Sequence, residues 1–134
     1  MPERLTFDSE PLLAFFLDEA GAEIVEEYLS KIQSGELEGF INVVNLAEVY
    51  YISYRLDPML ADENYRALTS LGLTVIPVEN DDLWRDAAKI KAKYSLSLAD
   101  AFAVATAKVF KAKLVVGSDR EFEGAGANLL RIRK

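Results

Sequence analysis

The sequence contains no cysteine and no histidine, and these two absences narrow its chemistry at once. Without cysteine the chain forms no disulfide, offers no thiolate nucleophile and has no cysteine-ligated zinc site. Without histidine it lacks the residue that most often serves as a general base or a metal ligand. Any catalysis by this chain must therefore use oxygen ligands, hydroxyls, lysine or arginine.

Long hydrophobic runs are also missing. The first apolar stretch, residues 11–17, is short and lies between acidic residues, whereas a signal peptide has a basic start. No later segment has the roughly 20 apolar residues that cross a bilayer. The longest candidate, residues 96–109, is rich in alanine and contains Asp100. We therefore expect a cytoplasmic protein without a membrane partner.

Positive charge is in short supply. The chain has 15 Lys and Arg against 22 Asp and Glu, which gives a formal net charge of −7. Since no overall basic field attracts nucleic acid, a polyanion must be held locally or through a cation. The candidate local phosphate contacts are Lys89, Lys91, Lys93, Lys108, Lys111, Lys113, Arg131, Arg133 and Lys134.

The chain has enough apolar material to fold as one domain. It has 134 residues, 51% of them hydrophobic, and we expect a single domain over residues 1–134. Short apolar runs alternate with longer amphipathic ones, which predicts an α/β fold with a mainly parallel sheet. The expected strands are 5–7, 40–44, 73–76, 114–116 and 129–132, and the expected helices are 12–17, 22–32, 45–56, 58–71, 81–94 and 98–110. Asn45 is the expected N-cap of the third helix.

Four acidic residues fall where these elements begin or end. Asp8 and Asp119 follow predicted strands, and Glu48 and Asp100 fall in the first turns of predicted helices. In an open parallel sheet the carboxyl ends of the strands border the crevice where ligands bind. Four close carboxylates would repel each other, but a hard divalent cation relieves that cost and prefers oxygen ligands. We therefore expect Mg²⁺ or Mn²⁺ at this edge.

The same acids also have a purely structural interpretation. Residues 45–48 and 97–100 both have the spacing of a capping box, and an acid near a helix N-terminus interacts well with the helix dipole. Asp8 would cap the helix that follows it, and Asp119 would be a turn residue. Taken one at a time, the acids do not distinguish the two interpretations.

The residues around the acids resemble the PIN-domain family, and more narrowly its small VapC-type toxin ribonucleases. Residues 5–9 with 12–16 resemble the first acidic motif of that family, and residues 45–49 resemble the second. Residues 97–107 are similar to the third motif almost throughout, and residues 114–122 are similar to the fourth. The resemblance covers nearly the whole chain, with four motifs in order.

This resemblance implies a three-layer α/β/α sandwich and a metal-dependent ribonuclease, the toxin of a toxin-antitoxin pair. Carried over by position, it implies that Asp8, Glu48, Asp100 and Asp119 form the acidic metal pocket, with Glu121 as an auxiliary acid. It further implies a homodimer, an RNA substrate, and an antitoxin whose basic side chain enters the acidic pocket.

Three positions depart from the family pattern. Glu10 stands where a small polar residue is frequent, Gly117 where a Thr or Ser commonly precedes the fourth acid by two positions, and Asn45 where a Ser or Thr is frequent. Ser118 is the neighbouring candidate for the missing hydroxyl. Ser9 is a candidate for orienting Asp8 or a water, or alternatively a turn hydroxyl. These changes bear on metal affinity and rate more than on the fold.

Two other functions fit parts of the sequence. Residues 8–10, Asp-Ser-Glu, faintly resemble the Asp-x-Asp loop of haloacid-dehalogenase-type phosphatases, with residues 117–119 as a later metal motif. Alternatively, the acidic crevice belongs to a non-catalytic PIN-like module that binds a basic peptide. Phosphatase activity on small phosphoesters would favour the first alternative, and tight peptide binding without metal would favour the second.

Overall fold

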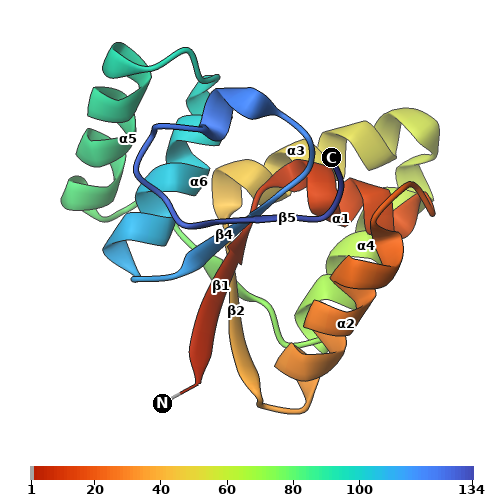
Figure 1. The fold of residues 1–134 in the computed structure, drawn as a ribbon. Helices are drawn as coiled ribbons and strands as arrows, with labels where there is room; N and C mark the ends of the chain where they lie inside the picture. The colour runs from red at the N-terminus through yellow and green to blue at the C-terminus, as the bar shows by residue number, and fades with distance from the viewer. Residues whose placement is uncertain (1) are drawn as a thin grey trace.

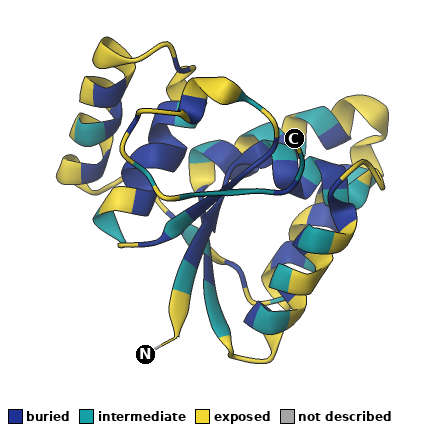
Figure 2. Cartoon of the chain, in the orientation of Figure 1, coloured by how far each residue is buried: buried dark blue, intermediate teal, exposed yellow. Residues whose placement is uncertain are grey.

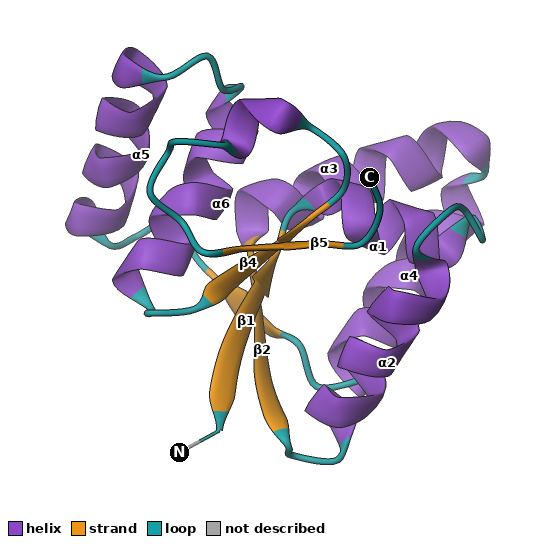
Figure 3. Cartoon of the chain, in the orientation of Figure 1, coloured by secondary structure: helices purple, strands orange, loops and turns teal. Residues whose placement is uncertain are grey.

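A computed structural model describes residues 2–134 and has the predicted order of elements (Figure 1, Figure 3). The elements are β1 (Glu3–Phe7), α1 (Ser9–Phe16), α2 (Ala22–Gln33), β2 (Leu37–Asn42), α3 (Val43–Leu56), α4 (Pro58–Ser70), β3 (Thr74–Ile76), α5 (Asp81–Lys93), α6 (Leu98–Val109), β4 (Lys113–Val116), the 3-10 helix η1 (Arg120–Phe122) and β5 (Leu129–Arg131).

The five strands form one sheet in the order β3-β2-β1-β4-β5, and every neighbouring pair is parallel. β1 lies at the centre, with Thr6 opposite Phe40 of β2 and Phe7 opposite Val115 of β4. The predicted α/β fold is therefore confirmed, and the sheet is parallel throughout.

Helices cover both faces of the sheet (Figure 1). On one face α6 packs against the sheet and α5 packs against α6, through residues such as Leu83, Val104 and Leu114. On the other face α1 and α2 pack through residues such as Leu12 and Leu29, and the buried residues follow the two interfaces (Figure 2). The two hydrophobic clusters give the three-layer α/β/α arrangement that was predicted.

The strand order places a switch point at the carboxyl end of β1. The chain passes from β1 to β2 on one side, while β4 and β5 lie on the other side of β1. Such switch points leave a crevice at the carboxyl edge of the sheet. Asp8 directly follows β1 at this edge, and α1 begins at the next residue, Ser9.

Several element boundaries differ from the predicted ones. The strand predicted over 40–44 is β2 and ends at Asn42, and α3 begins at Val43. The N-cap of α3 is Asn42, whose side chain accepts a hydrogen bond from the Val44 backbone N–H at 2.9 Å. The prediction of Asn45 as the N-cap is therefore wrong. A short capped turn outweighs the strand preference of the β-branched residues that follow it.

The first helix also begins earlier than predicted, at Ser9 instead of residue 12, because Pro11 is accommodated within its first turn.

Within residues 2–134, no helix has the length and apolar character that a membrane span requires.

Candidate metal centre

Three of the four predicted acids meet at the carboxyl edge of the sheet. Asp8, Glu48 and Asp100 each offer a carboxylate oxygen, and these three oxygens lie within 4.8 Å of one another. They come from the end of β1, the second turn of α3 and the first turn of α6. The parallel sheet thus brings together side chains that are up to 92 positions apart (100 − 8 = 92).

Asp8 is the most enclosed of the three. It is only 3% exposed, and its Oδ1 atom has no hydrogen-bond partner within residues 2–134. Its backbone N–H donates to the Val115 carbonyl at 3.0 Å, which fixes the residue to β4. Asp8 occupies the N-cap position of α1 but makes no side-chain cap bond. The capping interpretation of Asp8 therefore leaves its buried carboxylate unexplained, since buried polar atoms normally have partners.

Glu48 is held by Ser9, which the sequence offered as a partner of Asp8. The Ser9 hydroxyl donates to Glu48 Oε1 at 3.0 Å, and Ser9 is itself buried. Because α3 begins at Val43, Glu48 lies beyond its first turn and is not part of a capping box. Ser9 thus orients the second acid of the cluster.

Asp100 combines both interpretations. Its backbone N–H donates to the Ser97 hydroxyl at 3.1 Å, so Ser97 is the N-cap of α6 as the capping interpretation requires. The Asp100 carboxylate nevertheless belongs to the cluster with Asp8 and Glu48. One residue in the first turn therefore supports the helix start with its backbone and the cluster with its side chain.

The close acids change each other's proton affinity. Burial raises the pKa of Asp8 well above its ordinary range, and the negative charges of Asp100 and Glu48 raise it further. Burial also raises the pKa of Asp100, with Glu48 and Asp119 adding to the effect and the Ser97 hydroxyl opposing it. Without a cation, Asp8 and Asp100 therefore keep their protons to a higher pH than exposed aspartates do.

Asp119 lies near the cluster without joining the group of three. Its carboxylate accepts a hydrogen bond from the Glu121 backbone N–H at 2.8 Å and caps η1, as a turn residue would. Arg131 holds the same loop by donating to the carbonyls of Gly117 at 3.2 Å and Asp119 at 2.9 Å. Ser118 is exposed and so is the Glu121 side chain. These two auxiliary candidates are therefore exposed and do not belong to the group of three carboxylates.

Asn45 has a different position from the one predicted. It is fully buried inside α3, and its Nδ2 atom donates to the Ala99 carbonyl at 3.0 Å. Ala99 directly precedes Asp100, so this bond ties the helix that carries Glu48 to the turn that carries Asp100. The sequence identified Asn45 as unusual but gave it a local role, because a contact across 54 positions has no local signal.

The two other departures from the family pattern are neighbours. A Cβ atom on Gly117 would overlap the Glu10 carboxyl group, so Glu10 fills the space of the absent side chain. Glu10 also pairs with Arg133, whose other guanidinium nitrogen donates to the Ala20 carbonyl at 2.9 Å. Glu10 is therefore engaged at the β4 edge and is not one of the clustered acids.

The donor set fits a hard divalent cation. Three carboxylates offer oxygen ligands, and one of their oxygens, Asp8 Oδ1, is buried without a partner within the described chain. Mg²⁺ and Mn²⁺ prefer oxygen ligands, and a cation would offset both the burial and the repulsion that raise the pKa of Asp8. Asp8, Glu48 and Asp100 are thus the residues that would hold the metal, with Asp119 beside them.

Solved structures of toxins and toxin-antitoxin complexes are among those similar to this chain. A toxin-antitoxin complex from Klebsiella pneumoniae matches with a TM-score of 0.76 and 19% identity, over 96% of this chain and 97% of the other. VapBC2 from Rickettsia felis, bound to a promoter DNA fragment, matches with a TM-score of 0.76 and 12% identity, over 96% and 98%. Mycobacterium tuberculosis VapC20, a sarcin-ricin loop cleaving toxin, matches with a TM-score of 0.68 and 15% identity, over 92% and 95%.

No curated protein matches the sequence. The profile of the PIN domain, however, matches residues 5–128, which is most of the chain and includes all of the acids discussed above. The all-parallel sheet and the acidic cluster at its carboxyl edge agree with that match. The chain therefore belongs to the PIN-domain family.

Proposed function

We propose that this protein is a divalent-metal-dependent endoribonuclease and the toxin of a toxin-antitoxin pair. The observation that carries the proposal is the group of three carboxylates, Asp8, Glu48 and Asp100, whose oxygens lie within 4.8 Å of one another. A chain without histidine has no imidazole pair for RNA cleavage, so these acids are its means of phosphodiester hydrolysis.

The acids have distinct tasks in this mechanism. Asp8 is the buried ligand, and its backbone holds it to β4. Asp100 is the second ligand, and like Asp8 it has a raised pKa without a cation. Glu48 keeps its orientation through Ser9, and Asp119 adds negative charge at the rim. When bound, a divalent cation supplies an acidified water and stabilises negative charge on the phosphate.

A basic cavity beside the Asp119 loop supports an RNA substrate. Its volume is about 250 Å³, and it is lined by Ser118, Arg120, Glu123, Arg131 and Lys134. Arg131 is engaged with backbone carbonyls, whereas Arg120 and Lys134 form no ion pair within residues 2–134. We infer that Arg120 and Lys134 contact the RNA phosphates next to the scissile bond. Arg133, the neighbouring candidate, is paired with Glu10 instead.

The toxin role rests on similarity to toxin-antitoxin structures, including a toxin named for cleavage of the sarcin-ricin loop. Under this proposal the protein acts in the cytoplasm as a homodimer, and a cognate antitoxin inhibits it by placing a basic side chain in the acidic cluster. Charge complementarity favours such an inhibitor, because the cluster carries three carboxylates.

The two alternatives lose support from the same geometry. A phosphatase loop of the Asp-x-Asp type needs its second acid beside the first, but Glu10 pairs with Arg133 and lies against Gly117. A non-catalytic peptide-binding module requires no buried carboxylate without a partner, whereas Asp8 has one. A metal-dependent enzyme accounts for both observations.

The test is RNA cleavage by the metal-stripped protein with and without added Mn²⁺, alongside calorimetric titration of Mn²⁺. We expect cleavage only with the metal, and we expect Asp100→Asn to lose both Mn²⁺ binding and cleavage while remaining folded. Glu63→Gln is the matched control, because it also removes one negative charge but lies exposed on α4. Cleavage in excess chelator that survives Asp8→Asn would contradict the proposal.

A further inference from the structure

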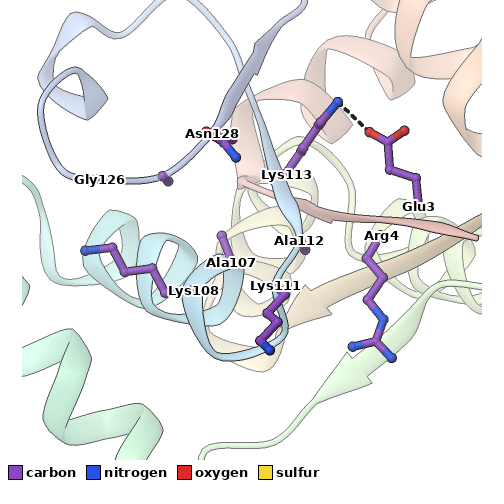
Figure 4. Close-up of a pocket in the computed structure, with 10 residues that line it drawn as sticks. Glu3, Arg4, Ala107, Lys108, Lys111, Ala112, Lys113, Gly126 and Asn128 are labelled. Carbon is purple, nitrogen blue, oxygen red and sulfur yellow. Dashed lines mark ion pairs between the residues drawn. The ribbon is translucent and has the colours of Figure 1, made fainter. Parts of the chain in front are cut away.

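A second basic cavity lies at the opposite edge of the sheet from the acidic cluster. Its volume is about 320 Å³, within the range of roughly 300–1,000 Å³ that is typical of small-ligand sites. It is lined by Glu3, Arg4, Ala107, Lys108, Lys111, Ala112, Lys113, Gly126, Ala127 and Asn128 (Figure 4). The start of β1, the end of α6 and the segment before β5 thus form its walls.

Its charge is opposite to that of the molecule. Four of the lining residues are basic and only Glu3 is acidic, although the whole chain has a net charge of −7. Lys113 pairs with Glu3 at 2.7 Å (Figure 4), but Lys108 and Lys111 form no ion pair within residues 2–134. The cavity therefore presents two free ammonium groups above small side chains.

The C-terminal end of α6 does not account for these two lysines. Basic residues often sit at a helix C-terminus to interact with its last carbonyls. Here Arg4 already donates from Nη1 to the Phe110 carbonyl at 3.1 Å. Lys108 extends instead toward the loop of Gly126 (Figure 4). If Gly126 carried a side chain, its Cβ atom would lie 2.9 Å from the Lys108 Nζ atom.

Lys111 occupies a position where its side chain is a disadvantage for folding. Its φ angle is +54°, in the left-handed region that glycine adopts without strain and that ends many helices. Asp18 has the same φ angle, so the backbone conformation does not by itself assign a function to Lys111. It does make glycine the substitution that removes the lysine and relieves the strain together.

We propose that this cavity binds the phosphate of a nucleotide. Lys108 and Lys111, whose side chains lie on different sides of the cavity (Figure 4), supply its unpaired positive charge for the phosphate, and Ala127 is the least buried of the alanines that line it. The cavity is at the far end of α6 from Asp100, roughly 15 Å along the helix axis. Binding there needs neither the metal nor the carboxylates, so this proposal is independent of the nuclease activity.

The experiment is an NMR and calorimetric titration in excess chelator with two probes, adenosine 5′-monophosphate and a short single-stranded RNA. We expect the amide resonances of residues 107–113 and 126–128 to shift. Lys108→Gln with Lys111→Gln should weaken binding about tenfold or more, as expected for the loss of charged hydrogen bonds. The matched control is Arg55→Gln with Arg66→Gln, which removes the same charge from exposed positions on α3 and α4.

A single variant separates a binding role from a structural one. Lys111→Gly relieves the left-handed strain, so we expect a higher Tm together with weaker nucleotide binding. A lower Tm, or unchanged affinity for both probes, would overturn the proposal, as would equal losses in the two double variants. Tighter binding of the RNA than of the mononucleotide identifies the phosphate as part of a strand, and the reverse identifies a free nucleotide.

Discussion

Asp8 is the residue at which the proposed function opposes stability. Its carboxylate is almost fully buried, one oxygen has no partner within the described chain, and two further carboxylates lie beside it. Burying such a group without compensation costs free energy. The residue is thus unfavourable for the metal-free fold and well suited to a cation.

The first prediction follows from the sign of the pKa shift of Asp8. Burial raises the pKa in the folded state, so the folded protein holds this proton more tightly than the unfolded chain does. This contribution to stability is present below the ordinary value of 3.8 and is lost as pH rises through the raised pKa. We therefore expect Asp8→Asn to raise the free energy of unfolding of the metal-free protein at neutral pH.

Urea denaturation in chelator checks this prediction. The gain from Asp8→Asn should shrink as the pH falls toward 3.8, and Mn²⁺ should stabilise the wild type but not the variant. An Asn variant that is less stable than the wild type at neutral pH would mean that the ionised carboxylate is compensated within the fold.

The second prediction concerns the contact between Glu10 and Gly117. Gly117→Ser places a Cβ against the Glu10 carboxyl and should destabilise the protein by about 1 to 3 kcal/mol. Glu10→Ser removes the partly exposed ion pair with Arg133 and should cost about 1 kcal/mol at most. The double variant should be more stable than the sum of the two effects predicts, by about 1 kcal/mol. A thermal denaturation cycle measures this coupling, and additive effects would contradict it.

At the scale of elements, the junction between β2 and α3 depends on Asn42. Its Oδ1 caps α3, and its Nδ2 donates to the Thr106 hydroxyl at 3.1 Å across the buried interface with α6. Asn42→Ala should therefore cost about 2 to 4 kcal/mol, the sum of a lost cap and an unsatisfied buried group. Asn42→Ser keeps a cap acceptor but is too short for Thr106, so it should cost less.

Asn80→Ala provides the comparison for this third prediction. Asn80 caps the exposed start of α5 through the backbone N–H groups of Asp82 and Leu83 and makes no bond across an interface. Its loss should cost only about 1 kcal/mol. Equal losses of unfolding free energy at Asn42 and Asn80 in denaturant titrations would show that the bond to Thr106 contributes nothing.

The order of elements could be predicted from the sequence because apolar runs and amphipathic stretches alternate so regularly. The boundary at Asn42 could not, because residues 40–44 form one continuous apolar and β-branched run apart from that residue. Neither the hydrophobic periodicity nor the β-propensity of these residues marks where the strand ends and the helix begins. The cap was visible as an asparagine, but Asn45 offered the same signal three positions later.

The acids of the candidate site were predictable, and their partners were not. Asp8 and Asp100 stand at positions that a parallel sheet necessarily brings to one edge. The hydrogen bonds from Ser9 to Glu48 and from Asn45 to Ala99 join residues that are 39 and 54 positions apart. The contact of Glu10 with Gly117 joins residues that are still farther apart in the sequence. Such pairs depend on the packed structure and leave no pattern in a single sequence.

At the scale of the whole molecule, the separation of charge would allow an acidic protein to bind RNA, as the proposed function requires. The net charge of −7 gives no general attraction for RNA, but basic residues gather in a cavity beside the Asp119 loop. Local contacts of this kind orient a strand, and the cation at the acidic cluster would remove the remaining repulsion. The same arrangement would admit a basic antitoxin side chain when no RNA is bound.

The last prediction measures these local contacts through salt. Each phosphate contact on a single strand changes the slope of log K against log salt by about 0.7, so replacing Arg120 and Lys134 with Gln should reduce its magnitude by about 1.4. Binding is measured with the Asp100→Asn variant in chelator, which prevents cleavage. Arg55→Gln with Arg66→Gln, at exposed positions on α3 and α4, should leave the slope unchanged. An equal reduction in both double variants would mean that RNA responds to total charge, and the cavity beside Asp119 would then have no special role in binding.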